Sequence, residues 1–268
     1  MPFIITFQNS PLSVPDGSSA GQVMTHNAPG SDILIVNGYP VEPEYCLQQG
    51  DTLLCITRGS VPTAEELQYL MAARHTPGVH QRLQQATVGI AGVGGLGSAI
   101  ATALVRVGIG HLIYADFDLV EPSNLNRQQY FSDQIGLTKV HALTDTLTRI
   151  NPYTKLEPHH LRLGPDESEE LFKTCDIVIE AFDQAEAKAM LADTVLTRLQ
   201  NTTLIAASGV AGFGDCNAIV TRRISDRFYL VGDGVSEAAV GRGLMAPRVG
   251  VAAGHQADLV ITILMERS

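Results

Sequence analysis

The chain has 268 residues, a hydrophobic fraction of 45% and a mean hydropathy of +0.10, so it can bury a sizeable core and is not intrinsically disordered. Its formal net charge of −10 argues against a general nucleic-acid binder, although a nucleotide site needs only local positive charge. It has no apolar run long enough to span a membrane and no basic, apolar N-terminal signal, so we expect neither a membrane span nor a signal peptide.

Residues 1–60 are predicted to form a series of short strands and one short helix. The strands cover residues 3–8, 12–14, 33–36, 39–41 and 52–57, and the helix runs through residues 23–26. Asn9-Ser10 and Asn37-Gly38 are predicted as hairpin turns, and Ser18 or Ser19 as the cap of the helix. This order suits a small β-grasp domain of the ubiquitin type.

Residues 61–85 are interpreted as a helical bridge. Thr63 and Glu66 have the spacing of a capping box, which predicts a helix over residues 65–73. The run Thr76-Pro77-Gly78 then ends that helix.

Residues 86–268 are predicted to alternate between strands and helices. Strands are indicated at residues 87–91, 111–115, 177–181, 204–207, 218–221 and 229–231, and helices at 96–107, 138–150, 185–199 and 248–265. This alternation implies an α/β domain with a Rossmann-like, mostly parallel sheet and helices on both faces.

The stretch GVGGLGS lies between an apolar strand and a helix. Gly92 and Gly94 allow a tight turn and let backbone N–H groups approach a phosphate, and Gly97 lets the helix pack close to the strand. The positive N-terminal end of that helix favours an anion at the same place. Asp116 ends the next strand, at a distance along the chain where the acid of a dinucleotide fold meets a ribose hydroxyl. These features predict a nucleotide site, against the alternative of a glycine-rich turn without a ligand.

More polar residues follow, beginning in the stretch DFDLVEPSNLNRQ at 116–128. Asn124 and Arg127 lie beyond the carboxyl end of a strand, where open α/β sheets bind ligands. Lys139 begins a helix, where the macrodipole disfavours a lysine, so either an anion lies nearby or the side chain is a solvated surface lysine. Asp183 follows an apolar strand and precedes a helix, so it is either a helix N-cap or a Mg²⁺ ligand near phosphates.

Several stretches that occur in one order carry a resemblance to a known family. They are GVGGLGS at 92–98, DFDLVEPSNLNRQ at 116–128, the helix with Lys139, RINP at 149–152, EAFDQAEAKAML at 180–191 and GLMAPRVGVAAGHQA at 243–257. Together they resemble the ThiF/MoeB adenylating enzymes, relatives of the ubiquitin-activating enzymes, over about residues 65–268. The closest form is the short ThiF type associated with thiamine biosynthesis. The resemblance implies an adenylyltransferase that uses ATP and Mg²⁺ to activate the C-terminal glycine carboxylate of a small β-grasp sulfur carrier.

The resemblance also implies roles for the residues around the nucleotide. Gly92, Gly94, Gly95 and Gly97 would line the ATP phosphates. Asp116 would hold the ribose.

Further roles carry over to the charged and amide side chains. Asn124 and Arg127 would contact the phosphates, Lys139 would neutralise charge on them, and Asp183 would coordinate Mg²⁺. Arg74 is compared with an arginine that the family supplies from an N-terminal helix, often from the partner subunit, which implies a homodimer. Its spacing departs from the MoeB-like pattern, so a solvated helix residue is an equal alternative for Arg74.

The cysteines depart from the MoeB-like pattern of paired CxxC zinc motifs, since Cys46, Cys55, Cys175 and Cys216 form no such pair. We therefore expect no zinc, no disulfide framework and a cytoplasmic location. Cys216 lies in the region where some ThiF proteins form a covalent link with their carrier, but we favour a buried small hydrophobe at this position. Cys175 is expected to be structural.

Residues 1–60 resemble the sulfur carrier ThiS, through DILIVNGYPVEPEYCLQQGDTLLCITRGS at 32–60. A carrier ends in Gly-Gly with a free carboxylate, whereas here the match ends at Gly59-Ser60 and the chain continues. We therefore expect that this domain is not adenylated in the intact chain and that the partner is a separate ThiS-like sulfur carrier.

Other functions stay open at this point. An NAD-dependent dehydrogenase would use the same glycine-rich fingerprint, but it leaves SNLNRQ, Lys139 and Asp183 unexplained. A non-catalytic scaffold is disfavoured by the intact set of polar residues. A related adenylating enzyme could act on another carrier, a tRNA base or a peptide carboxylate, and only the ThiS-like domain argues for the thiamine pathway.

Overall fold

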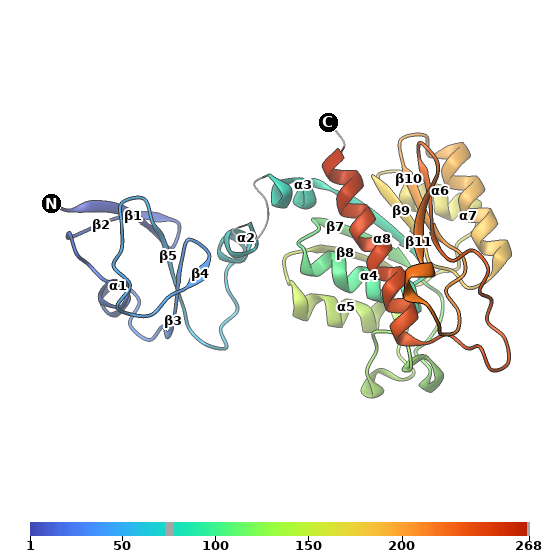
Figure 1. The fold of residues 1–268 in the computed structure, drawn as a ribbon, viewed down its shortest axis with the longest axis horizontal. Coiled ribbons are helices and arrows are strands. Elements are labelled where there is room, and N and C mark those ends of the chain that lie inside the picture. Colours follow the sequence, from blue (N-terminus) through green and yellow to red (C-terminus); the bar gives the residue numbers. More distant parts are fainter. Residues whose placement is uncertain (73–77, 267–268) are drawn as a thin grey trace. The chain divides into compact units, whose positions relative to one another are not determined.

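The computed structural model describes residues 1–72 and 78–266 of the chain. They divide into two compact units, Met1–His80 and Gln81–Ser268, each with its own sheet and its own hydrophobic core (Figure 1). The predicted bridge is divided between them, with helix α2 (Ala64–Ala72) in the first unit and helix α3 (Val79–Gln85) across the division. None of the helices in the described residues combines the length and apolar character needed to cross a membrane.

The first unit is a mixed sheet with a helix packed on it. Its other elements are β1 (Phe3–Phe7), β2 (Ser10–Val14), α1 (Ala20–Asn27), β3 (Ile33–Val36), β4 (Tyr39–Pro40) and β5 (Thr52–Ile56). The sheet order is β2-β1-β5-β3-β4, in which β1 and β5 are parallel and the other neighbours antiparallel. Ala20 and Val23 of α1 join a buried cluster with Ile5, Leu34 and Leu53 from the sheet. The predicted ubiquitin-like domain is confirmed.

Two local signals in this unit are confirmed in detail. Asn37 and Gly38 have φ values of 51° and 83°, as a two-residue turn between β3 and β4 requires. Ser19, rather than Ser18, caps α1: its hydroxyl accepts from the Gln22 N–H at 3.3 Å, and the Gln22 side chain accepts from the Ser19 N–H at 2.9 Å.

The first hairpin turn lies one residue earlier than predicted. It is formed by Gln8-Asn9, with φ values of 45° and 64°, and not by Asn9-Ser10. The reason is the strand register, which pairs the buried Ile5 with Leu12 on the face toward the core. A shift by one residue would turn these apolar side chains to the other face of the sheet.

The second unit contains the predicted alternation of strands and helices. Its elements after α3 are β6 (Thr87–Ala91), α4 (Gly95–Arg106), β7 (His111–Ala115), α5 (Lys139–Ile150), β8 (Lys155–His159), α6 (Pro165–Phe172), β9 (Ile177–Glu180), α7 (Ala185–Arg198), β10 (Thr203–Ala207), β11 (Val220–Ser225), β12 (Phe228–Gly232) and α8 (Ala246–Glu266). Among the described residues the strands form a 7-stranded sheet in the order β11-β12-β10-β9-β6-β7-β8. Every neighbouring pair is parallel except β11 and β12. Helices α4, α5 and α8 cover one face and α6 and α7 the other, so the predicted Rossmann-like architecture is confirmed (Figure 1).

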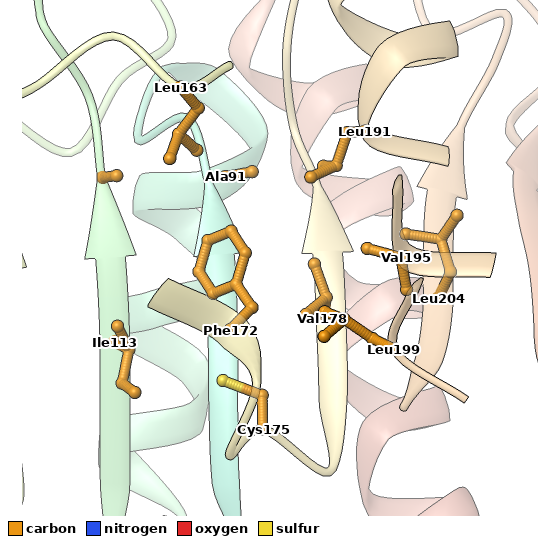
Figure 2. Packing of buried hydrophobic residues seen from close by; sticks show 11 residues of the cluster. Ala91, Ile113, Leu163, Phe172, Cys175, Val178, Leu191, Val195, Leu199 and Leu204 are labelled. Atoms are coloured by element: carbon orange, nitrogen blue, oxygen red, sulfur yellow. The ribbon is translucent and has the colours of Figure 1, made fainter. Parts of the chain in front are cut away.

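The core under α6 and α7 holds the middle of the sheet together (Figure 2). Phe172 of α6 is fully buried, and it packs on β6 where Gly89 leaves room, since a Cβ at Gly89 would lie 2.5 Å from the phenyl ring. Leu191 and Val195 of α7 join the same cluster. Burial of each such side chain stabilises the fold by about 1.5–3 kcal/mol. This packing fixes β6 beside β9, the strands whose ends carry the predicted site.

Two elements of the second unit were not placed from the sequence. Strand β8 has the polar sequence KLEPH, and it lies at the edge of the sheet, where a proline such as Pro158 is tolerated. Helix α6 begins at Pro165 and carries Asp166 and Glu167 in its first turn, and all three residues are start signals for a helix.

The strand order reverses direction at β6. From β6 the chain adds β7 and β8 on one side, and it then crosses to add β9, β10 and β12 on the other. In open α/β sheets, ligands bind outside the carboxyl ends of the strands at such a switch point. Here that place is the end of β6 and β9, which is followed by the glycine-rich turn on one side and by Asp183 on the other.

Candidate functional site

The glycine-rich turn joins β6 tightly to α4. Gly92 has a φ of +88°, and its N–H donates to the Ala115 carbonyl at 2.9 Å. A Cβ at Gly92 would lie 2.9 Å from the Ala181 carbonyl oxygen, and a Cβ at Gly97 would overlap the Gly92 carbonyl. Both glycines are therefore required by close backbone packing.

Gly94 and Gly95 open helix α4 under fewer constraints. Gly94 is the N-cap residue, and a Cβ there would meet only the Gln128 amide nitrogen at 3.7 Å, an ordinary contact. At Gly95 a Cβ would be 3.2 Å from Val249 Cγ1, which is tight. The first N–H groups of a helix lack partners within the helix and carry the positive end of its dipole, so this turn can bind an anion.

Asp116 anchors the glycine-rich turn to the end of β7. Its carboxylate is buried; Oδ2 accepts from the Val93 N–H at 2.8 Å, and Oδ1 accepts from the Asp118 N–H at 2.9 Å. Asp116 thus shapes the turn itself. Its contact with a ribose stays a prediction.

Lys139 forms an ion pair with Asp118, which was not among the predicted site residues. Its Nζ donates to Asp118 Oδ2 at 2.8 Å, and its backbone N–H donates to the Asp118 carbonyl at 3.0 Å. The lysine side chain is only 8% exposed, so a solvated surface lysine is excluded. Asp118 is the second acid of the DFD motif at residues 116–118.

The loop after β7 is folded around Asn124. This residue is buried, its side-chain oxygen accepts from the Glu121 N–H at 3.0 Å, and its carbonyl accepts from the Arg127 N–H at 3.1 Å. The Arg127 guanidinium donates to the Ser123 carbonyl at 3.1 Å and to Asn126 Oδ1 at 2.8 Å. The stem of Arg127 lies next to Gly95, 3.4 Å from where a Cβ would be, so this cation is held beside the start of α4.

Two hydroxyl groups tie this loop to the glycine-rich turn. The Ser98 hydroxyl donates to the Gly94 carbonyl at 2.6 Å and accepts from the Gln129 N–H at 3.1 Å. The Tyr130 hydroxyl donates to the Val93 carbonyl at 2.7 Å, and burial raises the pKa of Tyr130. Neither Ser98 nor Tyr130 was among the predicted site residues.

Gln128 leaves a buried acceptor beside the same turn. Its Oε1 has no hydrogen-bond partner among the described residues, and its side-chain nitrogen lies near Gly94. A buried polar atom normally has a partner, so a ligand that donates a hydrogen bond fits this position.

Asp183 lies in the turn between β9 and α7. The N-cap of α7 is Gln184, so the reading of Asp183 as a helix N-cap is wrong. The Asp183 side chain is exposed, and no hydrogen bond or ion pair engages it within the part of the chain that the structure describes. An unengaged carboxylate at the switch point is available to a cation.

The remaining predicted residues are less central. Arg74 falls in residues 73–77, outside the described residues. Cys216 is exposed, so the favoured interpretation of a buried small hydrophobe is wrong; it begins the 3-10 turn Cys216–Ala218, in a segment, residues 213–218, that is exposed throughout. Cys175 is buried in the core of Figure 2, and desolvation raises the pKa of its thiol to about 12, in keeping with a structural residue.

Comparison with known proteins identifies the family. The model of the ThiF family matches residues 67–268, and that of ThiS-like ubiquitin matches residues 3–59. The chain therefore belongs to the ThiF family and carries a ThiS-like ubiquitin domain before the family's own domain.

Curated relatives include ubiquitin-like modifier-activating enzyme 5 from two animals. The Drosophila willistoni protein is 38% identical over 121 residues, which cover 41% of this chain and 30% of that protein. The Caenorhabditis elegans protein is 37% identical over 120 residues, which cover 41% of this chain and 29% of that protein. The match thus spans less than a third of these relatives.

Solved structures share the fold at low sequence identity. The E. coli tRNA N6-threonylcarbamoyladenosine dehydratase TcdA, in complex with AMP, has a TM-score of 0.68 and 22% identity, and the match covers 77% of this chain and 98% of that one. E. coli MccB with ATP has a TM-score of 0.56 and 22% identity, covering 80% of this chain and 67% of that one. At this identity the likeness supports the fold alone.

Proposed function

We propose that this chain uses Mg-ATP to adenylate the C-terminal carboxylate of a separate ThiS-like sulfur carrier. The observation that carries the proposal is the meeting of three features at the carboxyl ends of β6, β7 and β9. They are the glycine-rich turn that opens α4, the buried cation of Lys139 and the unengaged carboxylate of Asp183. Membership of the ThiF family supports the proposal, as do the folds of TcdA, solved with ATP and with AMP, and of MccB, solved with ATP.

The reaction requires positive charge more than a base. The carrier carboxylate attacks the α-phosphorus of ATP and pyrophosphate leaves, so two anions must be brought together. Arg127, Lys139 and the N-terminal end of α4 supply the positive potential that offsets their repulsion. A terminal carboxylate is already ionised at neutral pH, so no residue has to remove a proton. Catalysis then depends on positioning and electrostatic stabilisation.

The residues present fit a magnesium ion that is held partly by the nucleotide. Mg²⁺ prefers oxygen ligands and is usually held by one or two carboxylates together with substrate phosphates. No group of three or more His, Cys, Asp or Glu side chains in the described residues is arranged for a metal, so Asp183 would hold Mg²⁺ with phosphate oxygens. The ion would neutralise charge on the phosphates. Asp116 and Asn124 would keep the surrounding loops in the shape that receives the nucleotide.

The N-terminal unit is proposed to act as a carrier-like domain and not as the substrate. Its last strand is followed by a turn, in which Gly59 has a φ of +82° and the Ser60 N–H donates to the Thr57 carbonyl at 3.0 Å. The Arg58 N–H also donates to Asp32 at 2.8 Å. Gly59 has no free carboxylate, because its carbonyl belongs to the amide with Ser60. In this proposal the flexible tail that ends in a carboxylate comes from another protein.

The finer points of the proposal follow from the family resemblance. The ThiS-like domain favours thiamine biosynthesis as the pathway, and four free cysteines favour the reducing cytoplasm as the location. The arginine that the family takes from a partner subunit favours a homodimer, with Arg74 as the candidate for that role.

ATP–pyrophosphate exchange with a panel of acceptors tests the proposed function. The panel contains purified sulfur carriers ending in Gly-Gly, the same carriers with an amidated C-terminus, an unmodified tRNA and a short peptide. We expect exchange with Mg-ATP and a carrier that has a free C-terminal carboxylate. Exchange driven by the tRNA or the peptide alone would move the proposal to those acceptors, and tight NAD binding without ATP binding would replace it with a dehydrogenase.

A further inference from the structure

A buried carboxylate, Glu180, forms an ion pair with the partly exposed Lys188 next to the site. Glu180 is the last residue of β9, and its side chain is 1% exposed. Lys188 lies in the first part of α7, and its Nζ is 2.9 Å from each of the two carboxylate oxygens of Glu180. Burial raises the pKa of the Glu180 carboxyl, and the Lys188 ammonium opposes that change. The chemistry proposed above assigns no role to this pair.

The Glu180 carboxylate organises the backbone that follows β9. One oxygen accepts from the Phe182 N–H at 2.7 Å, so the side chain closes the turn that leads to Asp183. The other oxygen accepts from the Ala207 N–H at 3.4 Å, at the end of β10. The carboxylate therefore joins the ends of two adjacent strands.

Lys188 completes the same arrangement from the helix. Besides the two carboxylate oxygens, its Nζ donates to the Ala207 carbonyl at 3.1 Å, so all three ammonium protons have acceptors. An ammonium with no proton left to donate cannot bind a phosphate directly without giving up one of these bonds. Its geometry suits holding Glu180 in place.

The turn held by this pair presses against the glycine-rich turn. The Ala181 N–H donates to the Ala91 carbonyl at 2.9 Å, and a Cβ at Gly92 would lie 2.9 Å from the Ala181 oxygen and 3.2 Å from the Phe182 ring. A shift of residues 181–182 would therefore displace both Asp183 and the backbone at Gly92.

Fold stability alone does not account for this arrangement. Taking the Glu180 carboxylate out of water is costly, and its attraction to Lys188, which is 30% exposed, recovers little more than that cost. A carboxylate that accepts two backbone N–H groups, by contrast, specifies the shape of a turn, which apolar side chains cannot do.

We propose that Lys188 is a positioning residue that, through Glu180, holds the Asp183 turn against the glycine-rich turn and so sets the place of the metal and phosphates. The proposal rests on the adenylation function proposed above. Substitutions of residues that orient a metal ligand typically lower metal affinity or activity by about 10–100-fold. Because Lys188 acts through Glu180, its loss should lower turnover and raise the half-saturating Mg²⁺ concentration. The KM for the carrier should stay unchanged.

The test compares Lys188→Met with Lys188→Arg and with Arg198→Met. Arg198 lies on the same helix and pairs with Asp166 at 2.9 Å and Glu169 at 3.0 Å, away from the switch point, so its loss controls for a broken ion pair on α7. Backbone hydrogen exchange of residues 180–184 is measured on each free protein. ATP–pyrophosphate exchange is then measured against Mg²⁺ concentration, with thermal melts to confirm folding.

We expect faster hydrogen exchange at residues 180–184 in Lys188→Met, a turnover lower by about 10-fold or more and a raised half-saturating Mg²⁺ concentration. Lys188→Arg should restore most of all three quantities, because a guanidinium can also bind a carboxylate through two bonds. Arg198→Met should change none of the three. Equal hydrogen exchange in Lys188→Met and wild type would overturn the proposal. So would an equal half-saturating Mg²⁺ concentration in the two proteins, provided that the wild type is active.

Two further outcomes are distinguishable. Wild-type protein that neither binds Mg-ATP nor exchanges pyrophosphate would refute the proposed function, and hydrogen exchange of the free variants would still decide whether Lys188 holds the turn. If Lys188→Met does not fold, Glu180→Gln replaces it, because the amide keeps an acceptor for Phe182 but loses the ion pair. Glu180→Gln should show the same faster hydrogen exchange at residues 180–184 and the same raised half-saturating Mg²⁺ concentration, and the absence of these changes would overturn the proposal.

Discussion

Replacing Lys139 by methionine should separate the chemistry of the site from the stability of the fold. The Lys139 side chain is 8% exposed, whereas its partner Asp118, 2.8 Å away, is 46% exposed. Methionine keeps an apolar chain in the buried place, and Asp118 can be hydrated once its partner is gone. We therefore expect a loss of unfolding free energy in the range of exposed ion pairs, about 0–1 kcal/mol.

The effect of the same change on adenylation should be much larger. Loss of one preorganised group that stabilises developing charge costs about 10²–10³-fold in turnover, or about 2.7–4 kcal/mol at the transition state. Urea unfolding and ATP–pyrophosphate exchange on the same preparations measure the two quantities. Lys173→Met, which breaks an exposed pair with Glu170 at 2.6 Å, is the matched control and should affect neither strongly. If Lys139→Met exchanged pyrophosphate at the wild-type rate, or lost no more turnover than folded protein, the role of Lys139 in adenylation would be refuted.

The other predictions concern the glycine-rich turn, the exposed cysteine and the edge of the sheet. Gly94→Val should abolish Mg-ATP binding in calorimetry and still melt as a folded protein, and binding at the wild-type affinity would contradict this. Gly97→Ala should lower the melting temperature, because its Cβ would overlap a backbone carbonyl. Cys216→Ala should form the carrier adenylate at the wild-type rate, since an acyl phosphate forms without a thiol, and a folded variant that makes no adenylate would show the thiol to be needed. A hydrogen bond from His159 holds the pKa of Glu157 below its ordinary value of 4.5, so this carboxylate stabilises the fold above about pH 4.5 and the benefit is lost as the pH falls through the lowered value. Acid melts of Glu157→Gln should therefore fall less steeply than those of the wild type, and parallel curves would argue against this account.

The sequence was most informative where a local rule has a single geometric solution. The Thr63 and Glu66 spacing predicted a capping box, and the two reciprocal bonds are present at 2.9 and 3.2 Å. The glycine-rich turn and α4 lie where their pattern indicated, because Gly92 and Gly97 permit contacts that no side chain allows.

It was least informative about pairings across the fold. The partner of Lys139 could not be inferred, because the DFD motif offers two acids and spacing does not distinguish them. The Glu180–Lys188 pair depends on β9 and β10 being neighbours, which only the sheet order reveals. The exposure of Cys216 depends on a local turn, whereas the expectation rested on how free cysteines behave on average.

Intact-mass spectrometry of a sulfur carrier incubated with this chain and Mg-ATP tests the central claim most directly. The account predicts that a carrier with a free C-terminal glycine carboxylate gains one AMP group, that the amidated carrier gains none, and that the mass of this chain is unchanged. AMP attached to this chain itself, or to the amidated carrier, would contradict the claim that a separate terminal carboxylate is the acceptor.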